Sequence, residues 1–137
     1  MSTKSTKPFT VKPELEPADY GDISALLTVM RQLRNPDGGC PWDLEQDFKS
    51  IAAYTVEEAY EVADAVERGD IDALVDELGD LLFSMVNLTR WAGAHAEDVL
   101  RKANQRFSKR YIGMEILASE RGQVFDALSL DEKELLW

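Results

Sequence analysis

Ten acidic side chains lie between residues 57 and 80 of this 137-residue chain, and the same window contains a single base. Two pairs of these acids, Glu58 with Glu61 and Glu77 with Asp80, are three positions apart, so each pair would share one face of a helix. Four clustered carboxylates raise one another's pKa, and a divalent cation relieves that repulsion. Because all the ligands are oxygens, they suit Mg²⁺, or Mn²⁺ as a substitute, better than zinc.

Two helices joined by a tight turn must position these acids. Apolar residues recur at helical spacing over residues 48–68, Gly69 ends that helix, and the next helix runs to about residue 92. In an antiparallel pair, one acid of each helix lies eight residues from Gly69 and the other lies eleven. At about 1.5 Å per residue, the acids are then level across the hairpin, roughly 12 and 16 Å from the turn. If these faces point inward, the four carboxylates converge.

A polar stripe on the helix over residues 70–92 favours the inward orientation. Glu77, Asp80, Ser84 and Asn87 follow one line along a helix that is otherwise apolar on nearly every side. We therefore expect this helix to be buried, with the stripe lining an interior site. Such a helix needs more cover than three short partners provide, so we also expect a homodimer or a dimer of dimers. The alternative, a solvated acidic face, is our expectation for the remaining acids Asp64, Glu67, Asp70, Asp72 and Asp76.

A basic strip between residues 101 and 110 contains five bases and no acid. Lys102, Arg106 and Lys109 or Arg110 follow helical spacing, with Asn104 between them. Basic groups opposite metal-bound carboxylates would suit a polyphosphate chain. On spacing alone, an exposed basic face that pairs with acidic helices of this chain or of a partner subunit is an equal alternative.

The remaining pattern predicts helices and turns, without strands or repeats. Residues 1–20 read as an extended arm, and residues 35–43 as a loop. Further helices are predicted over residues 23–33, from residue 93 to about 122, and after the capping box that begins at Ser129. We predict an all-α fold: one domain over residues 21–137, built as an antiparallel four-helix bundle with a short C-terminal helix.

Composition excludes several functions. A net charge of −11 argues against a nucleic acid polymer or an anionic membrane as partner, and no apolar run approaches the roughly 20 residues of a membrane span. The single cysteine, Cys40, suits a reducing cytoplasm, and with one histidine, His95, a Cys/His zinc site cannot be built. We expect loop packing for Cys40 and a surface or capping role for His95. Trp42 could stack on a base, but anchoring the loop is the role we expect.

Three motifs resemble those of MazG-type nucleoside triphosphate pyrophosphohydrolases, a group within the all-α NTP pyrophosphatases. They are GGCPWD at residues 38–43, EEAYE at 57–61 and DELGDLLF at 76–83, and the resemblance runs from about residue 23 to the C-terminus. It implies an assembly that is at least dimeric, Mg²⁺ dependence, and cleavage of an NTP to an NMP and pyrophosphate. By the same resemblance, Glu58, Glu61, Glu77 and Asp80 would be the metal ligands. Lys102, Asn104 and Arg110, together with the nearby Arg106, would contact phosphate or sugar, and Trp137 would stack on the base.

The expected mechanism is metal-assisted attack of water at the α-phosphorus, with pyrophosphate leaving. Glu57 or one of the four ligands would accept the proton from water. Two alternatives stay open at this point. One is a pyrophosphatase restricted to a deoxynucleotide such as dUTP or dCTP, and the other is a non-catalytic helical module that binds a nucleotide or a protein.

Overall fold

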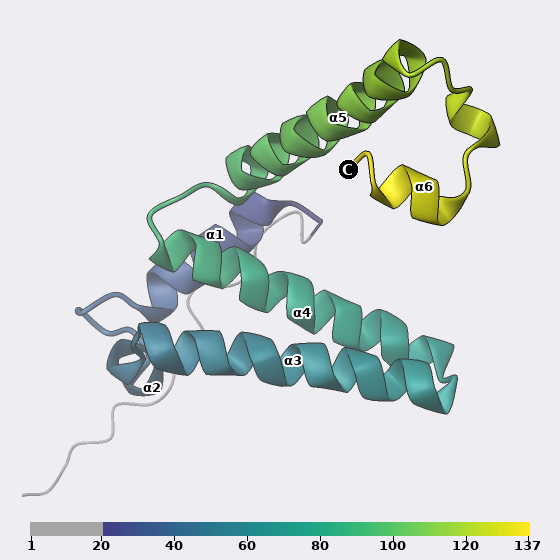
Figure 1. Ribbon diagram of the computed structural model, residues 1–137. Coiled ribbons are helices and arrows are strands. Elements are labelled where there is room, and N and C mark those ends of the chain that lie inside the picture. The colour runs from purple at the N-terminus through teal and green to yellow at the C-terminus, as the bar shows by residue number, and fades with distance from the viewer. Residues whose placement is uncertain (1–20) are drawn as a thin grey trace, which may run out of the picture. The chain divides into compact units, whose positions relative to one another are not determined.

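The computed structural model describes residues 21–137, and the arm predicted at residues 1–20 lies outside them. The elements are helices, and no strand forms between residues 21 and 137 (Figure 1). In chain order they are α1 (Ile23–Leu33), α2 (Pro41–Glu45), α3 (Phe48–Arg68), α4 (Ile71–Trp91), α5 (Ala96–Glu120), the 3-10 turn η2 (Phe125–Ala127) and α6 (Leu130–Glu134). The prediction of an all-α fold with four long helices and a short C-terminal one is confirmed.

The chain divides into two compact units, one reaching Gly93 and the other covering residues 94–137. In the first unit, α3 and α4 form a hairpin and α1 packs against α4 (Figure 1). In the second, α5 contacts η2, and Tyr111 of α5 packs edge-on against Phe125 with ring centroids 5.4 Å apart. The single domain predicted over residues 21–137 stays a prediction.

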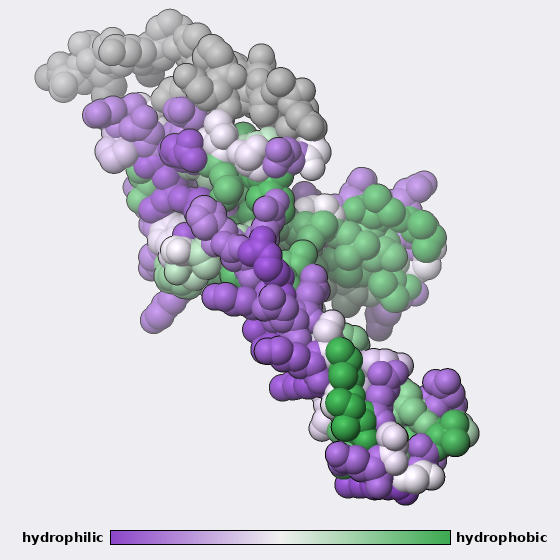
Figure 2. Space-filling view, turned by 90° about the horizontal axis from the view of Figure 1, so that it is seen from above, coloured by the Kyte–Doolittle hydropathy of each residue, from purple (hydrophilic) through white to green (hydrophobic). Residues whose placement is uncertain are grey.

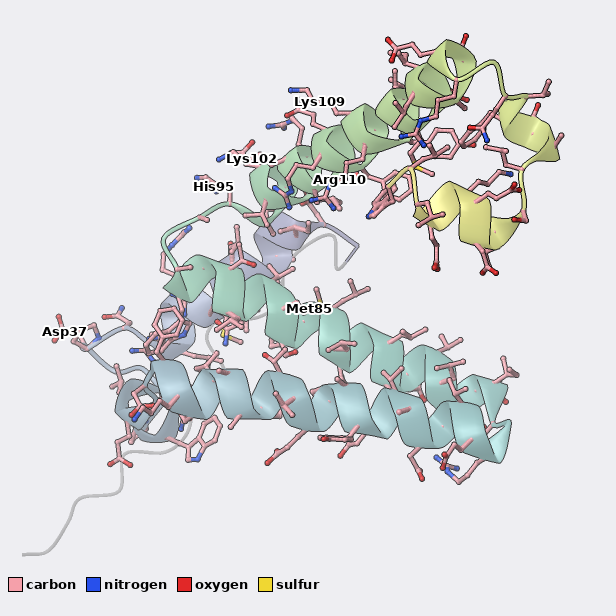
Figure 3. The ribbon with its side chains drawn as sticks, viewed as in Figure 1. Asp37, Met85, His95, Lys102, Lys109 and Arg110 are labelled. Atoms are coloured by element: carbon pink, nitrogen blue, oxygen red, sulfur yellow. The ribbon has the colours of Figure 1, made fainter. Side chains whose placement is uncertain are left out.

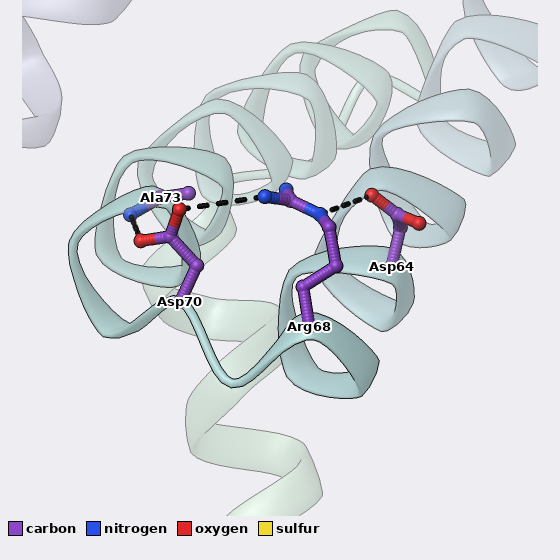
Figure 4. Close-up of polar contacts among 4 residues, drawn as sticks. All are labelled: Asp64, Arg68, Asp70 and Ala73. Carbon is purple, nitrogen blue, oxygen red and sulfur yellow. Dashed lines mark hydrogen bonds and ion pairs between the residues drawn. The ribbon is translucent and has the colours of Figure 1, made fainter.

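The hairpin turn is built from the residues that the sequence assigned to it. Gly69 adopts φ 66°, a left-handed conformation that glycine tolerates, and the Asp70 side chain accepts a hydrogen bond from the Ala73 amide. Arg68 lies between two acids, with its Nε 2.8 Å from Asp64 and its Nη1 3.4 Å from Asp70 (Figure 4). The turn is therefore closed by a helix stop, a cap and two ion pairs.

The loop predicted over residues 35–43 ends earlier than expected, because α2 begins at Pro41. Proline is favoured in the first turn of a helix, where its missing N–H would have no intrahelical acceptor in any case. Figure 3 shows Asp37 at the outer end of this loop, where its amide donates to the Asn35 side chain. The backbone folds back closely at Gly39, whose amide donates to the Asn35 carbonyl oxygen at 2.8 Å. The turn η2 was also not predicted.

The expectation that the helix after Gly69 is buried is wrong for the single chain. Its two buried residues are polar, with Ser84 1% and Asn87 8% exposed, whereas Leu82 is 62% exposed. Met85 projects from α4 away from α3 (Figure 3). Hydrophobic side chains gather over the hairpin, while α5 is mostly hydrophilic (Figure 2). Ser84 and Asn87 of the polar stripe are therefore covered, while apolar residues on the flanks of α4 are left without cover.

Candidate metal centre

Three carboxylates from the two helices of the hairpin converge. Glu58 of α3 and Glu77 and Asp80 of α4 each offer an oxygen, and these oxygens lie within 4.8 Å of one another. The placement follows from the turn, because equal distances from Gly69 bring residues of antiparallel helices to the same level. The geometry could hold one divalent cation between three oxygen ligands.

Glu58 is the most buried member of the cluster, with 5% of its surface exposed. Its Oε2 is inaccessible to solvent and has no hydrogen-bond partner among residues 21–137. A buried carboxylate oxygen without a donor is costly, and a bound cation would satisfy it. The residues present therefore fit a divalent cation.

Tyr54 lies one helical turn before Glu58, and its phenol is near that carboxylate. Its interaction with Glu58, together with burial and the nearby charges of Glu58, Asp80 and Glu61, raises the pKa of Tyr54 to about 12. The hydroxyl consequently keeps its proton at neutral pH and is available as a donor to the carboxylate. Sequence reasoning missed this residue, although its four-residue spacing from Glu58 in a helix was a usable signal.

Glu61, the fourth predicted ligand, is exposed and lies outside the group of three. Its carboxylate is near that of Glu77. Desolvation, the interaction with Glu61 and the charges of Glu61, Asp80 and Glu58 raise the pKa of Glu77. A cation bound beside these like charges would relieve their repulsion.

A cavity of about 440 Å³ opens beside the cluster, towards the end of the hairpin far from Gly69. Glu57, the candidate proton acceptor, lines this cavity, and so does Trp42, whose side chain is 65% exposed. The expectation that Trp42 anchors the loop in the core does not match that exposure. Asn87 of the polar stripe is a further lining residue.

The predicted substrate contacts of the second unit lie along α5 and at the C-terminus. Lys102, Asn104, Arg106 and Arg110 are all exposed, and Figure 3 shows Lys102, Lys109 and Arg110 along α5. The Arg110 guanidinium lies 5.5 Å from the Trp137 ring centroid, and Phe107 packs against the same ring at 5.4 Å. Trp137 is therefore positioned by α5 within its own unit.

Two other residues singled out from the sequence have structural positions. His95 is the exposed N-cap residue of α5, although its side chain makes no capping hydrogen bond. Cys40 is a free thiol at the N-cap of α2. Of the acids expected to be solvated, all five are exposed.

Comparison with known proteins matches this hairpin to a family. The model of the MazG nucleotide pyrophosphohydrolase domain matches residues 46–112, and the chain belongs to this family. A nucleoside triphosphate pyrophosphohydrolase of Escherichia coli K12 is 61% identical over 64 residues, which are 47% of this chain and 24% of that protein. A protein of the same name from Mycolicibacterium smegmatis is 31% identical over 135 residues, covering 91% of this chain and 36% of the relative.

A shorter relative is aligned over most of its own length. The phosphoribosyl-ATP pyrophosphatase of Pelotomaculum thermopropionicum is 36% identical over 90 residues, which are 65% of this chain and 91% of the relative. The chain thus spans about a quarter of the Escherichia coli relative and nearly all of this shorter one. In the part of the chain that the structure describes, no helix combines the length and apolar character needed to cross a membrane.

Proposed function

We propose that this protein hydrolyses a nucleoside triphosphate to a nucleoside monophosphate and pyrophosphate. The observation that carries the proposal is the convergence of Glu58, Glu77 and Asp80 within 4.8 Å, with a buried Glu58 oxygen that lacks a partner. The printed names of the relatives, nucleoside triphosphate pyrophosphohydrolase and phosphoribosyl-ATP pyrophosphatase, support the same reaction class.

Glu58, Glu61, Glu77 and Asp80 would hold Mg²⁺, with Mn²⁺ as a substitute. When bound, the cation supplies positive charge to the phosphate oxygens and makes water a better nucleophile. The protein's own part is to keep these carboxylates close together, and the Tyr54 hydroxyl orients Glu58. No side-chain nucleophile is required.

In the proposed reaction, the oxygen of water forms a bond to the α-phosphorus. The bond from that phosphorus to the oxygen bridging to the β-phosphorus breaks, and pyrophosphate leaves. A carboxylate takes the proton of the attacking water. Glu57 is one acceptor, because it is exposed, lines the cavity and is adjacent to the cluster residue Glu58, and one of the four ligands is the other.

The exposed side chains of α5 would bind the rest of the substrate. Lys102, Arg106 and Arg110 would neutralise phosphate oxygens, and Asn104 would hydrogen-bond phosphate or sugar. Trp42 and Trp137 each present a ring that could stack on a base. The substrate is proposed to be a free nucleotide rather than a nucleic acid polymer, consistent with the net charge of −11.

We further propose that the protein acts in the cytoplasm as a homodimer or a dimer of dimers. The uncovered apolar flank of the hairpin supports assembly, since Val75 and Leu82 are each 62% exposed. A second copy would cover this flank in the way that a homodimer interface does. The free thiol of Cys40 agrees with a reducing compartment.

A panel of nucleotides tests the activity and its range. The purified chain would be incubated with the common NTPs, dUTP, dCTP, ITP and phosphoribosyl-ATP, with Mg²⁺ or with EDTA, and monophosphate and pyrophosphate would be quantified. We expect Mg²⁺-dependent release of both products, and hydrolysis of dUTP or dCTP alone would favour the deoxynucleotide-restricted alternative. If no member of the panel releases pyrophosphate, the alternative of a non-catalytic module remains.

Variants connect the activity to the cluster. Asp80→Ala or Glu61→Ala should abolish hydrolysis while the circular dichroism spectrum stays helical. Asp76→Ala is the matched control, because Asp76 is an exposed acid of the same helix outside the cluster. Undiminished turnover in either of the first two variants would remove that residue from the catalytic set.

A further inference from the structure

The cavity beside the carboxylates has a flat aromatic side chain, apolar walls and one buried amide. Trp42 of α2, Ile51 and Tyr54 of α3, and Phe83 and Asn87 of α4 all line it. The cavity lies entirely in the first unit. Such a combination suits a planar ring that stacks on one face and makes a specific hydrogen bond at its edge.

Asn87 is held in a single orientation by Arg90. The guanidinium donates from Nε and Nη2 to the Asn87 Oδ1, at 3.4 and 3.3 Å. A guanidinium offers donors only. Rotating the Asn87 amide by 180° would turn its amino group towards the guanidinium and place donors opposite donors. The Asn87 side chain therefore keeps its oxygen on Arg90 and its Nδ2 amino group elsewhere.

The Nδ2 group of Asn87 is a buried polar group left for a ligand, beside the more exposed polar side chains of Asp43, Gln46, Ser50 and Glu57 that also line the cavity. Asn87 is 8% exposed and lines the cavity, and within residues 21–137 no hydrogen bond to its Nδ2 is formed. Nδ2 has no partner within these residues, yet it is not sealed from solvent. Asn87 thus offers the cavity a fixed donor, Nδ2, and no acceptor.

The position of Asn87 along α4 relates this donor to the carboxylate cluster. Asn87 follows Asp80 by seven residues, which is about 10 Å along the helix axis. A substrate with its phosphates at the carboxylates could extend its nucleoside over that distance. Glu57 and Tyr54 line the cavity between the two ends, and the Tyr54 phenol is near Glu58.

We propose that this cavity holds the nucleobase and that Asn87, positioned by Arg90, selects bases with a keto oxygen over those with an amino group at the same place. Uracil and hypoxanthine carry an acceptor where cytosine and adenine carry a donor. An amino group facing the Asn87 amide would leave two donors unpaired in a desolvated site, which disfavours binding. The inference rests on the proposed function for its substrate class, nucleotides.

Binding of product nucleotides tests the inference without requiring turnover. Isothermal titration calorimetry in Mg²⁺ would compare dUMP with dCMP and IMP with AMP, since the members of each pair exchange a keto oxygen for an amino group at one ring position and, with it, lose the proton on the adjacent ring nitrogen. We expect the keto member of each pair to bind about 5-fold or more tightly. Equal affinities within twofold in both pairs would overturn the inference.

Two variants assign the preference to the residues named. Asn87→Asp places an acceptor in the cavity while keeping the contact with Arg90, so the preference should reverse towards dCMP and AMP. Arg90→Met leaves Asn87 free to rotate, so both ratios should approach one with little loss of total affinity. An unchanged ratio in either folded variant would contradict the proposal, and melting curves establish which variants are folded.

The outcome separates this inference from the proposed function. Keto preference in binding, with no pyrophosphate release from any triphosphate, would refute the enzyme and retain the base pocket. Hydrolysis with equal kcat/KM for dUTP and dCTP and for ITP and ATP would retain the enzyme and refute the role of Asn87. If Asn87→Asp does not fold, the wild-type ratios and Arg90→Met decide.

Discussion

Glu58 and Asp80 belong to different helices, yet each presents a carboxylate oxygen within 4.8 Å of the other and of Glu77. Without a cation, folding brings like charges together, and with one the same arrangement becomes a binding site. Stability and metal binding are therefore coupled in this hairpin.

The first prediction concerns that coupling. Mg²⁺ should raise the Tm, because the ion binds the folded state and not the separated carboxylates of the unfolded chain. At a concentration one hundred times the Kd, the gain is about 2.7 kcal/mol. Scanning calorimetry with a Mg²⁺ titration measures it. Asp80→Asn should remove the shift and Asp76→Asn should keep it, so an equal shift in both variants would contradict the site.

The second prediction concerns the Tyr54 hydroxyl near Glu58. Tyr54→Phe keeps the ring and deletes the hydroxyl that orients the carboxylate, so Mg²⁺ affinity should fall about 10- to 100-fold. The Mg²⁺ concentration at half-maximal Tm shift reports the affinity. Tyr60→Phe is the control, since Tyr60 is an exposed tyrosine of the same helix. Equal affinities in the two variants would show that Tyr54 has no orienting role.

The third prediction concerns the close backbone approach at Gly39. A Cβ there would lie 2.4 Å from the Asn35 carbonyl oxygen and 2.5 Å from that of Leu33, so Gly39→Ala should force the loop open and lower the Tm. Gly113→Ala is the opposite case, because a Cβ within α5 meets no atom within 4 Å. Its expected effect is a gain of up to about 1 kcal/mol from helix propensity. Urea unfolding of both variants is the measurement, and a neutral Gly39→Ala would refute the constraint.

The fourth prediction is a pH effect at α6. The Ser129 amide donates to the Glu132 carboxylate at 2.8 Å, and this bond, followed by the one to the Ser129 side chain, lowers the pKa of Glu132. A depressed pKa in the folded state stabilises the cap above the ordinary glutamate pKa, and the contribution disappears as pH falls through the lowered value. NMR titration should show Glu132 titrating below the ordinary glutamate pKa. Ser129→Ala removes the side-chain contact and keeps the amide donor, so the Glu132 pKa should move part of the way upward, and no movement would exclude the Ser129 side chain as a cause.

The fifth prediction concerns the uncovered flank of α4. Leu82→Glu places a charge in the surface that a second copy would cover, so light scattering should show dissociation to monomers. Leu130→Glu is the control, because Leu130 is 74% exposed but belongs to α6. A wild-type chain that is monomeric at high micromolar concentration would contradict the proposed assembly.

The helices were predictable because their ends carry local signals. Gly69 and Asp70 determine the turn by their own backbone and side-chain chemistry, and the capping box at Ser129 marks the start of α6 in the same way. The short helix α2 was missed because Pro41 is equally common in turns and in first helical turns, and the sequence alone does not distinguish the two.

The candidate site was predictable where helix geometry alone decides, as in the level placement of Glu58 and Asp80. Features that depend on a side-chain rotamer or on a third element were not. The donor role of Asn87 depends on Arg90 reaching back over one turn, and the cavity in front of it depends on where α2 places Trp42. The exposure of Leu82 depends on how many neighbouring helices cover α4, and hydrophobic periodicity carries no information on that number.

The equal spacing of the acids about Gly69 restricts how the length of this segment can vary among relatives. Losing one residue between Gly69 and Glu77 would rotate the following side chains by about 100° around the axis of α4, carrying both of its acids away from Glu58. The connection at residues 93–95 follows the four acids that are spaced about Gly69, and carries no such restriction. Natural insertions and deletions should therefore accumulate there and be absent from the hairpin.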